Sequence, residues 1–224
     1  MVNWSRAIPA YGTLQAKFGG KGHVGRETDQ AGVMRATEGL AYPVACIWLP
    51  AAGRGYGHAS VFIQEPQGEF PETDTSSYAS LFPGEDTRTG QQGARIEHLA
   101  PGRMLTAEFT CFVEDCAAES GKEGVFRLPD HMVPMGGLDI LRMQAAWNAI
   151  RDKPDAHYRL MRKNCATIAA RVIRAGMATK QHVLSPLLTH KAWWTPHDVL
   201  LLAQACPKSD YDRRIDGLVT ALKG

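Results

Sequence analysis

The spacing of hydrophobic and polar positions changes near the middle of the chain. Before about residue 130, apolar residues form short runs or alternate with polar ones, which is typical of β-strands. Two apolar runs, 44–50 and 58–65, flank the stretch AAGRGYG and predict two strands joined by a glycine-rich connection. Further strands are predicted at 76–82, 103–115 and 125–129. In the 103–115 run, alternation places one set of side chains on a buried face: Leu105, Ala107, Phe109, Cys111 and Val113.

From about Leu138 the spacing becomes helical. The segment LDILRMQAAWNAI predicts a helix whose buried face carries Leu138, Leu141, Ala145 and either Trp147 or Asn148. The segment TPHDVLLLAQA has the residues of a helix start, with Thr195 as the cap, Pro196 in the first turn and Asp198 three residues after the cap. The segment DRRIDGLVTAL predicts a last amphipathic helix. Strands followed by helices indicate an α+β fold, an antiparallel sheet packed against helices.

The chain divides into two parts by composition. Residues 1–40 are rich in glycine and polar residues with weak periodicity, and they predict a loop-rich N-terminal extension. Residues 41–224 hold the predicted strands and helices and are long enough for one domain with a substantial core.

Charge and composition exclude several classes of protein. A net charge of +2 argues against a dedicated nucleic-acid binder. No apolar run is long enough to span a membrane, so no stable membrane insertion is expected. The N-terminus lacks the apolar core of a signal peptide, which predicts synthesis in the cytoplasm. His, Cys and carboxylates show no metal-ligand spacing, so neither a metal site nor a cofactor is expected.

One of the five cysteines stands at a predicted helix start. In NCATIAARVIRAG, Cys165 begins an apolar stripe at helical spacing, Asn164 is a favoured N-cap residue, and Gly176 is expected to end the helix. The unpaired N–H groups and the dipole of a helix N-terminus stabilise a thiolate. A cysteine on an apolar stripe can equally be a core residue, as Cys46 and Cys111 in apolar runs are expected to be.

A histidine elsewhere in the chain favours the nucleophile interpretation. His58 opens a predicted strand directly after the turn GRGYG, where its ring can be reached from a neighbouring element. A cysteine hydrolase needs such a base to take the thiol proton. The alternative is a surface or capping histidine.

These segments carry a family resemblance. GYGHASVFI, followed about a hundred residues later by YRLMRKNCATIAARVIRAG, resembles the circularly permuted papain-like amidases and peptidases, in which the histidine strand precedes the Asn-Cys helix. SSYASLFPG, VFRLPDHM and WWTPHDVLLLA resemble the subset that are effectors of the type VI secretion system. The resemblance covers roughly residues 44–205 and implies a permuted papain-like fold.

The resemblance also implies roles for individual residues. Cys165 would be the nucleophile and His58 the general base and later acid. For the group that orients the imidazole, Ser77 and Ser80 fit by strand order, whereas Glu65 and Glu69 are stronger electrostatic partners but lie at the turn. Of these four we choose Ser80. The backbone N–H of Cys165 would stabilise the oxyanion, with Tyr158 as the second donor and Asn164 beside it. Tyr158 can equally be a core residue.

The implied function is a cysteine hydrolase that cleaves an amide bond, first of all in peptidoglycan, as a secreted antibacterial toxin. A secretion-system carrier and an immunity protein are the implied partners, and export would deliver the protein to the periplasm or cytoplasm of a target cell. Three alternatives stay open: a protease or deamidase acting on a target-cell protein, a lipid acyltransferase or lipase of the same fold, and a non-catalytic binding module.

Overall fold

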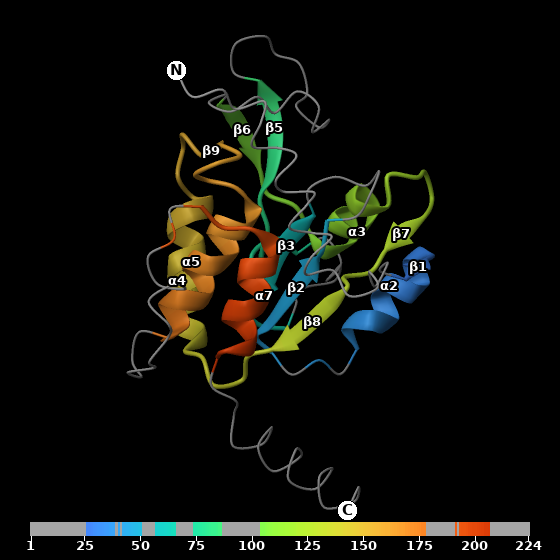
Figure 1. The fold of residues 1–224 in the computed structure, drawn as a ribbon, viewed down its shortest axis with the longest axis horizontal. Helices are drawn as coiled ribbons and strands as arrows, with labels where there is room; N and C mark the ends of the chain where they lie inside the picture. The colour runs from blue at the N-terminus through green and yellow to red at the C-terminus, as the bar shows by residue number, and fades with distance from the viewer. Residues whose placement is uncertain are drawn as a thin grey trace, which may run out of the picture.

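The computed structural model describes residues 26–38, 40, 42–50, 57–65, 74–86, 104–177, 191 and 193–206. These residues form an α+β fold built around one antiparallel sheet (Figure 1). None of the described helices is long and apolar enough to cross a membrane. The predicted helix DRRIDGLVTAL lies outside the described residues, as does most of the predicted N-terminal extension.

The central sheet has four strands in the order β4-β3-β2-β8. Strands β2 (Val44–Trp48) and β3 (His58–Phe62) pair antiparallel, with Trp48 opposite His58, and confirm the two strands expected at 44–50 and 58–65. Strand β4 (Tyr78–Ala79) pairs with β3, and β8 (His131–Pro134) pairs with β2. Gly57 has a positive φ of 75°, and a Cβ there would lie 2.4 Å from the Trp48 carbonyl oxygen, so the residue before His58 must be glycine.

Two smaller sheets flank this centre. Strands β5 (Phe82–Asp86), β6 (Leu105–Glu108) and β9 (His157–Tyr158) form one, in the order β5-β6-β9. Strands β1 (Glu27–Thr28) and β7 (Phe126–Arg127) form the other. The polypeptide expected as a single strand at 76–82 therefore supplies β4 to one sheet and leads into β5 of another.

Both faces of the central sheet are covered. Helices α4 (Ile140–Arg151), α5 (Cys165–Met177) and α7 (Pro196–Gln204) pack on the face that carries Ala45 and Val61. Helices α2 (Gln30–Thr37) and α3 (Phe112–Ser120) join the cluster on the opposite face (Figure 1). Because side chains alternate along a strand, β2 and β3 supply both cores. Val33 of α2 is fully buried, so the described part of the predicted loop-rich extension contains a helix that packs on the domain.

The predicted strand at 103–115 is wrong in its second half. Strand β6 ends at Glu108, and α3 begins at Phe112, with Cys111 as its N-cap. The Glu114 carboxylate accepts a hydrogen bond from the Cys111 N–H (2.9 Å), and Gly121 ends the helix in the left-handed conformation. Chance alternation of apolar residues concealed these helix signals.

Two details of the predicted helices are also wrong. Leu141 is 82% exposed, because the buried face of α4 is formed by Met143, Trp147 and Ile150. Gly176 does not end α5, which continues to Met177. A Cβ on Gly176 would lie 2.7 Å from Cγ of Met143, so this glycine permits close packing of α5 on α4. The capping of α7 by Thr195 and Asp198 is confirmed.

Candidate functional site

The candidate site lies where β3 and α5 begin. His58, the first residue of β3, is 2% exposed, and Cys165, the first residue of α5, is 8% exposed. The imidazole and the Cys165 side chain are close enough to interact, and this interaction contributes to the raised pKa of His58. The structure therefore brings together the two residues that the sequence singled out, although 107 positions separate them.

The Asn164 side chain fixes the start of α5. Its Oδ1 accepts hydrogen bonds from the backbone N–H (2.8 Å) and hydroxyl (2.8 Å) of Thr167, which caps the helix. Its Nδ2 donates to the carbonyl oxygens of Leu160 (2.8 Å) and Trp194 (3.0 Å). Asn164 was expected near the oxyanion, but these four bonds occupy its amide, so it positions Cys165 instead.

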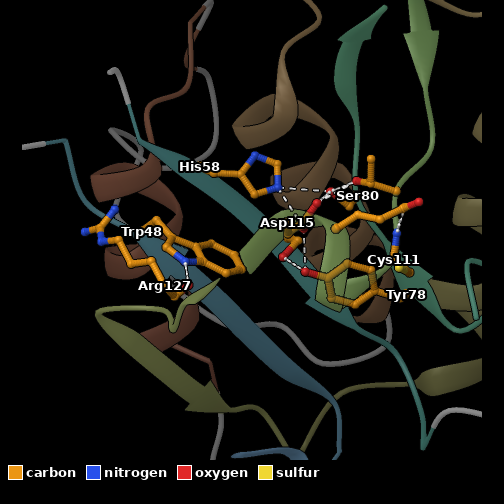
Figure 2. A network of polar contacts seen from close by, with 10 residues as sticks. Trp48, His58, Tyr78, Ser80, Cys111, Asp115 and Arg127 are labelled. Carbon is orange, nitrogen blue, oxygen red and sulfur yellow. Dashed lines mark hydrogen bonds and ion pairs between the residues drawn. The ribbon is translucent and has the colours of Figure 1, made fainter. Parts of the chain in front are cut away.

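Asp115 is the site residue that sequence reasoning missed. Its Oδ2 lies 3.0 Å from Nε2 of His58, and the carboxylate is completely buried (Figure 2). Asp115 lies on α3, in the segment that the alternation of apolar residues predicts as a strand. The Glu114 cap and Gly121 are the signals that could have revealed this helix. Since Nε2 contacts Asp115, Nδ1 is the ring nitrogen left for the thiol.

A group of hydroxyls surrounds the Asp115 carboxylate. Tyr78 donates to Oδ2 (2.5 Å), while Thr110 (2.6 Å) and Ser80 (3.1 Å) donate to Oδ1. Ser80 Oγ also lies 3.0 Å from His58 Nε2 (Figure 2). The residue expected to orient the imidazole thus contacts the ring, but it shares Nε2 with a carboxylate. Of the other candidates, Ser77 bonds to Asp74, and Glu69 lies outside the described residues.

The imidazole is held from its faces as well as its edges. Its ring centroid lies 5.4 Å from that of Trp48 and 4.3 Å from that of Phe82. Burial lowers the pKa of His58, but the charges of Asp115 and Cys165 and their hydrogen bonds to the ring outweigh it and raise this pKa well above its ordinary value. The site therefore favours the imidazolium form of His58, next to the Asp115 carboxylate.

Tyr158 of β9 closes the group around the thiol. It is 5% exposed and forms a hydrogen bond with Cys165. Burial, followed by the charge of Cys165 and that hydrogen bond, raises the pKa of Tyr158 well above its usual value. The phenol therefore stays protonated and can donate a hydrogen bond. Within the described part of the chain, no group of three or more His, Cys, Asp or Glu side chains is placed to hold a metal ion.

Comparisons with known proteins connect this region to bacterial toxins. The model of the family described as IcsB middle domain matches residues 111–210. A multifunctional-autoprocessing repeats-in-toxin protein of Vibrio vulnificus is 35% identical over 103 residues, which cover 45% of this chain and 2% of the toxin. A toxin of the same name from Vibrio cholerae serotype O1 is 32% identical over 102 residues, 43% of this chain and 2% of the toxin.

Part of this chain is related to bacterial effectors and toxins. The chain spans only about 2% of the length of these two curated relatives. The family match includes Asp115, Tyr158 and Cys165 and begins after His58 and Ser80.

Proposed function

We propose that this protein is a cysteine-dependent acyl-transfer enzyme of the permuted papain-like kind that acts as a bacterial toxin. The observation that carries the proposal is the His58 imidazole between the Cys165 thiol and the Asp115 carboxylate, with all three side chains buried. Three separate elements supply these groups, as a nucleophile, a base and an orienting carboxylate require.

The first half-reaction would transfer the acyl group to the enzyme. The Cys165 sulfur attacks the carbonyl carbon, and the oxyanion receives hydrogen bonds from the Cys165 backbone N–H and the Tyr158 hydroxyl. That N–H belongs to the first residue of α5 and has no partner within the helix. The C–N bond of an amide then breaks as the His58 imidazolium gives its proton to the departing nitrogen. This step leaves a thioester on Cys165.

In the second half-reaction, His58 takes a proton from water and the water oxygen attacks the thioester carbonyl. A carboxylic acid and the free cysteine are the products, so the overall reaction is amide hydrolysis. Asp115 holds the ring orientation in both halves, and Ser80 with Thr110 holds Asp115. The first substrate class to test is the peptide part of peptidoglycan, followed by target-cell proteins.

A second fate of the thioester is supported by the burial of Cys165 and His58. A thioester formed on Cys165, a residue that is only 8% exposed and that interacts with the Tyr158 hydroxyl, would be shielded from water. An amine that reaches it would accept the acyl group, and the protein would then be an acyltransferase. The chemistry up to the thioester is the same.

Mass spectrometry separates these outcomes. The protein is incubated with peptidoglycan fragments, with a target-cell protein extract, and with an acyl thioester plus a lysine-containing peptide. New carboxylic acid ends indicate hydrolysis, and an acylated lysine indicates transfer. Cys165→Ala is the negative control, and Lys122→Met, at an exposed ion pair with Glu27, is the matched active control. Turnover that survives Cys165→Ala would refute the proposal.

Expression in bacteria locates the substrate. If peptidoglycan is cleaved, expression in the cytoplasm is tolerated, whereas an added signal peptide that directs the protein to the periplasm causes lysis or rounding. Equal toxicity in the cytoplasm would identify a cytoplasmic substrate. Cys165→Ala should abolish toxicity in either compartment.

A further inference from the structure

Cys165, His58 and Asp115 form the proposed catalytic triad. A second cluster of buried charged groups lies beside it. Arg127 of β7, Glu119 of α3 and Asp130 form this Arg127 cluster. The Arg127 guanidinium donates from Nη1 to Glu119 (3.2 Å) and from Nη2 to Asp130 (2.6 Å). The Arg127 and Asp130 side chains are 1% and 0% exposed, and that of Glu119 is 9% exposed. The proposed reaction uses none of these groups.

The Arg127 cluster connects the two elements that hold His58. Glu119 lies one turn after Asp115 on α3, so the bond from Arg127 fixes the helix that supplies the carboxylate. Arg127 also acts on the end of β2, because its carbonyl oxygen accepts from Nε1 of Trp48 (2.8 Å). Figure 2 shows the Trp48 indole between Arg127 and the His58–Asp115 group.

Asp130 strengthens the connection to β2. Its Oδ2 accepts hydrogen bonds from the Arg127 guanidinium and from the backbone N–H of Leu49 (2.7 Å). Arg127 Nη2 also lies 3.4 Å from the Leu49 carbonyl oxygen. Leu49 directly follows Trp48, the residue paired with His58 across the sheet. One guanidinium therefore bonds both to α3, the helix that carries Asp115, and to Leu49, the residue that follows β2.

Stability alone does not explain these buried charges. Apolar side chains of similar volume often stabilise a fold as well as a buried ion pair or better, because taking charges out of water is costly. Among the described residues, Nε of Arg127 and Oδ1 of Asp130 have no hydrogen-bond partner, which adds to the cost. The directional bonds of a guanidinium fix relative positions that apolar packing leaves looser.

We propose that Arg127 is a positioning residue for the triad, which holds Asp115 and Trp48 at the distances that keep the His58 ring aligned with Cys165. The inference rests on the proposed function and deepens it. Arg127 touches neither the thiol nor the imidazole, so its guanidinium acts through Glu119 and Asp130, and its backbone carbonyl acts through Trp48.

The test compares folded variants by two measurements that need no substrate. The first is the rate at which iodoacetamide labels Cys165, determined by peptide mapping well below each variant's unfolding temperature. The second is the downfield proton resonance of the His58 Nε2–H that faces Asp115, assigned by its loss in His58→Gln. Glu119→Ala removes the bond from the guanidinium to α3, and Arg127→Lys disrupts the guanidinium bonds to Glu119 and Asp130, while the bond from Trp48 to the backbone carbonyl of residue 127 stays in both. Glu119→Gln keeps an acceptor for Nη1, and Lys122→Met is the exposed control.

We expect Glu119→Ala and Arg127→Lys each to lower the labelling rate about tenfold, because small misplacements of reacting groups are costly, and to shift or broaden the resonance. Glu119→Gln should recover most of both signals, and Lys122→Met should match the unaltered protein. If Arg127→Lys does not fold, the comparison of Glu119→Ala with Glu119→Gln decides the test.

A folded Glu119→Ala protein with an unchanged labelling rate and resonance would overturn the inference. Slow labelling of Cys165 in the unaltered protein would instead count against the proposed function. In that case the His58 resonance still reports whether the Arg127 cluster holds the ring, so the two failures are distinguishable.

Discussion

Asp115 and His58 form a buried pair, with Oδ2 and Nε2 3.0 Å apart and both side chains almost completely removed from solvent. The charge of Asp115 contributes to the raised pKa of His58, and hydroxyls of three other residues hold the carboxylate in place. The pair connects helix α3 to strand β3, so the geometry of the base depends on the packing of α3 against the sheet.

Replacing Asp115 by asparagine should remove the charge and keep the shape. The pKa of His58 should fall, because the imidazolium loses its anionic partner. The alkaline limb of the pH–rate profile should therefore move to lower pH, with activity at neutral pH reduced at least about tenfold. An alkaline limb that does not move would contradict the assignment of Asp115.

The same substitution should change the dependence of stability on pH. The pKa of His58 in the folded protein lies above its unfolded value of about 6.5. The pairing with Asp115 therefore contributes its full stabilisation below about pH 6.5, and this stabilisation is lost as pH rises through the folded pKa. Urea unfolding at several pH values should show this loss in the unaltered protein, and Asp115→Asn should reduce it.

Cys165 should be the cysteine that reacts fastest with iodoacetamide near pH 7. Burial raises the pKa of Cys111 to about 11 and that of Cys206 to about 12, and it raises the pKa of Cys46 and Cys116 well above the usual range. Cys165 lies beside the His58 ring, whose raised pKa favours a cation next to the sulfur. Peptide mapping after brief labelling checks the order, and His58→Gln should slow Cys165 alone.

Tyr158→Phe should separate oxyanion stabilisation from packing. The phenyl ring keeps the buried volume, so the free energy of unfolding should change by less than about 1.5 kcal/mol. Loss of one oxyanion donor should lower kcat by about 100-fold. If kcat stays within a factor of about two of the value for the unaltered protein, Tyr158 is a core residue and not an oxyanion donor.

Glu119→Gln should make the protein relatively more stable at alkaline pH. Burial raises the pKa of Glu119 to about 7, although the charges of His58 and Arg127 lower it in part. Because the folded protein retains this proton to higher pH than the unfolded chain, stability should fall as pH rises from about 4.5 to 7. Glu119→Gln should lack this fall. As pH rises across this range, its free energy of unfolding should increase by about 1–3 kcal/mol relative to that of the unaltered protein.

His58 shows how much of the site local sequence predicted. The glycine turn before it and the apolar run after it specify a strand start, and Asn164 before Cys165 specifies a helix start. These are local features, because caps and left-handed glycines act within a few residues. The α+β class and the capping of α7 by Thr195 are predictable for the same reason.

Asp115 shows what only the tertiary structure decided. Its role depends on α3 packing against β3, a contact between residues 57 positions apart that no local pattern contains. The alternation from Leu105 to Val113 fits a strand, and the Glu114 cap and the packing of Phe112 into the core gave a helix instead. The sequence by itself therefore determined where the nucleophile and the base begin their elements, and long-range packing decided which carboxylate reaches the base.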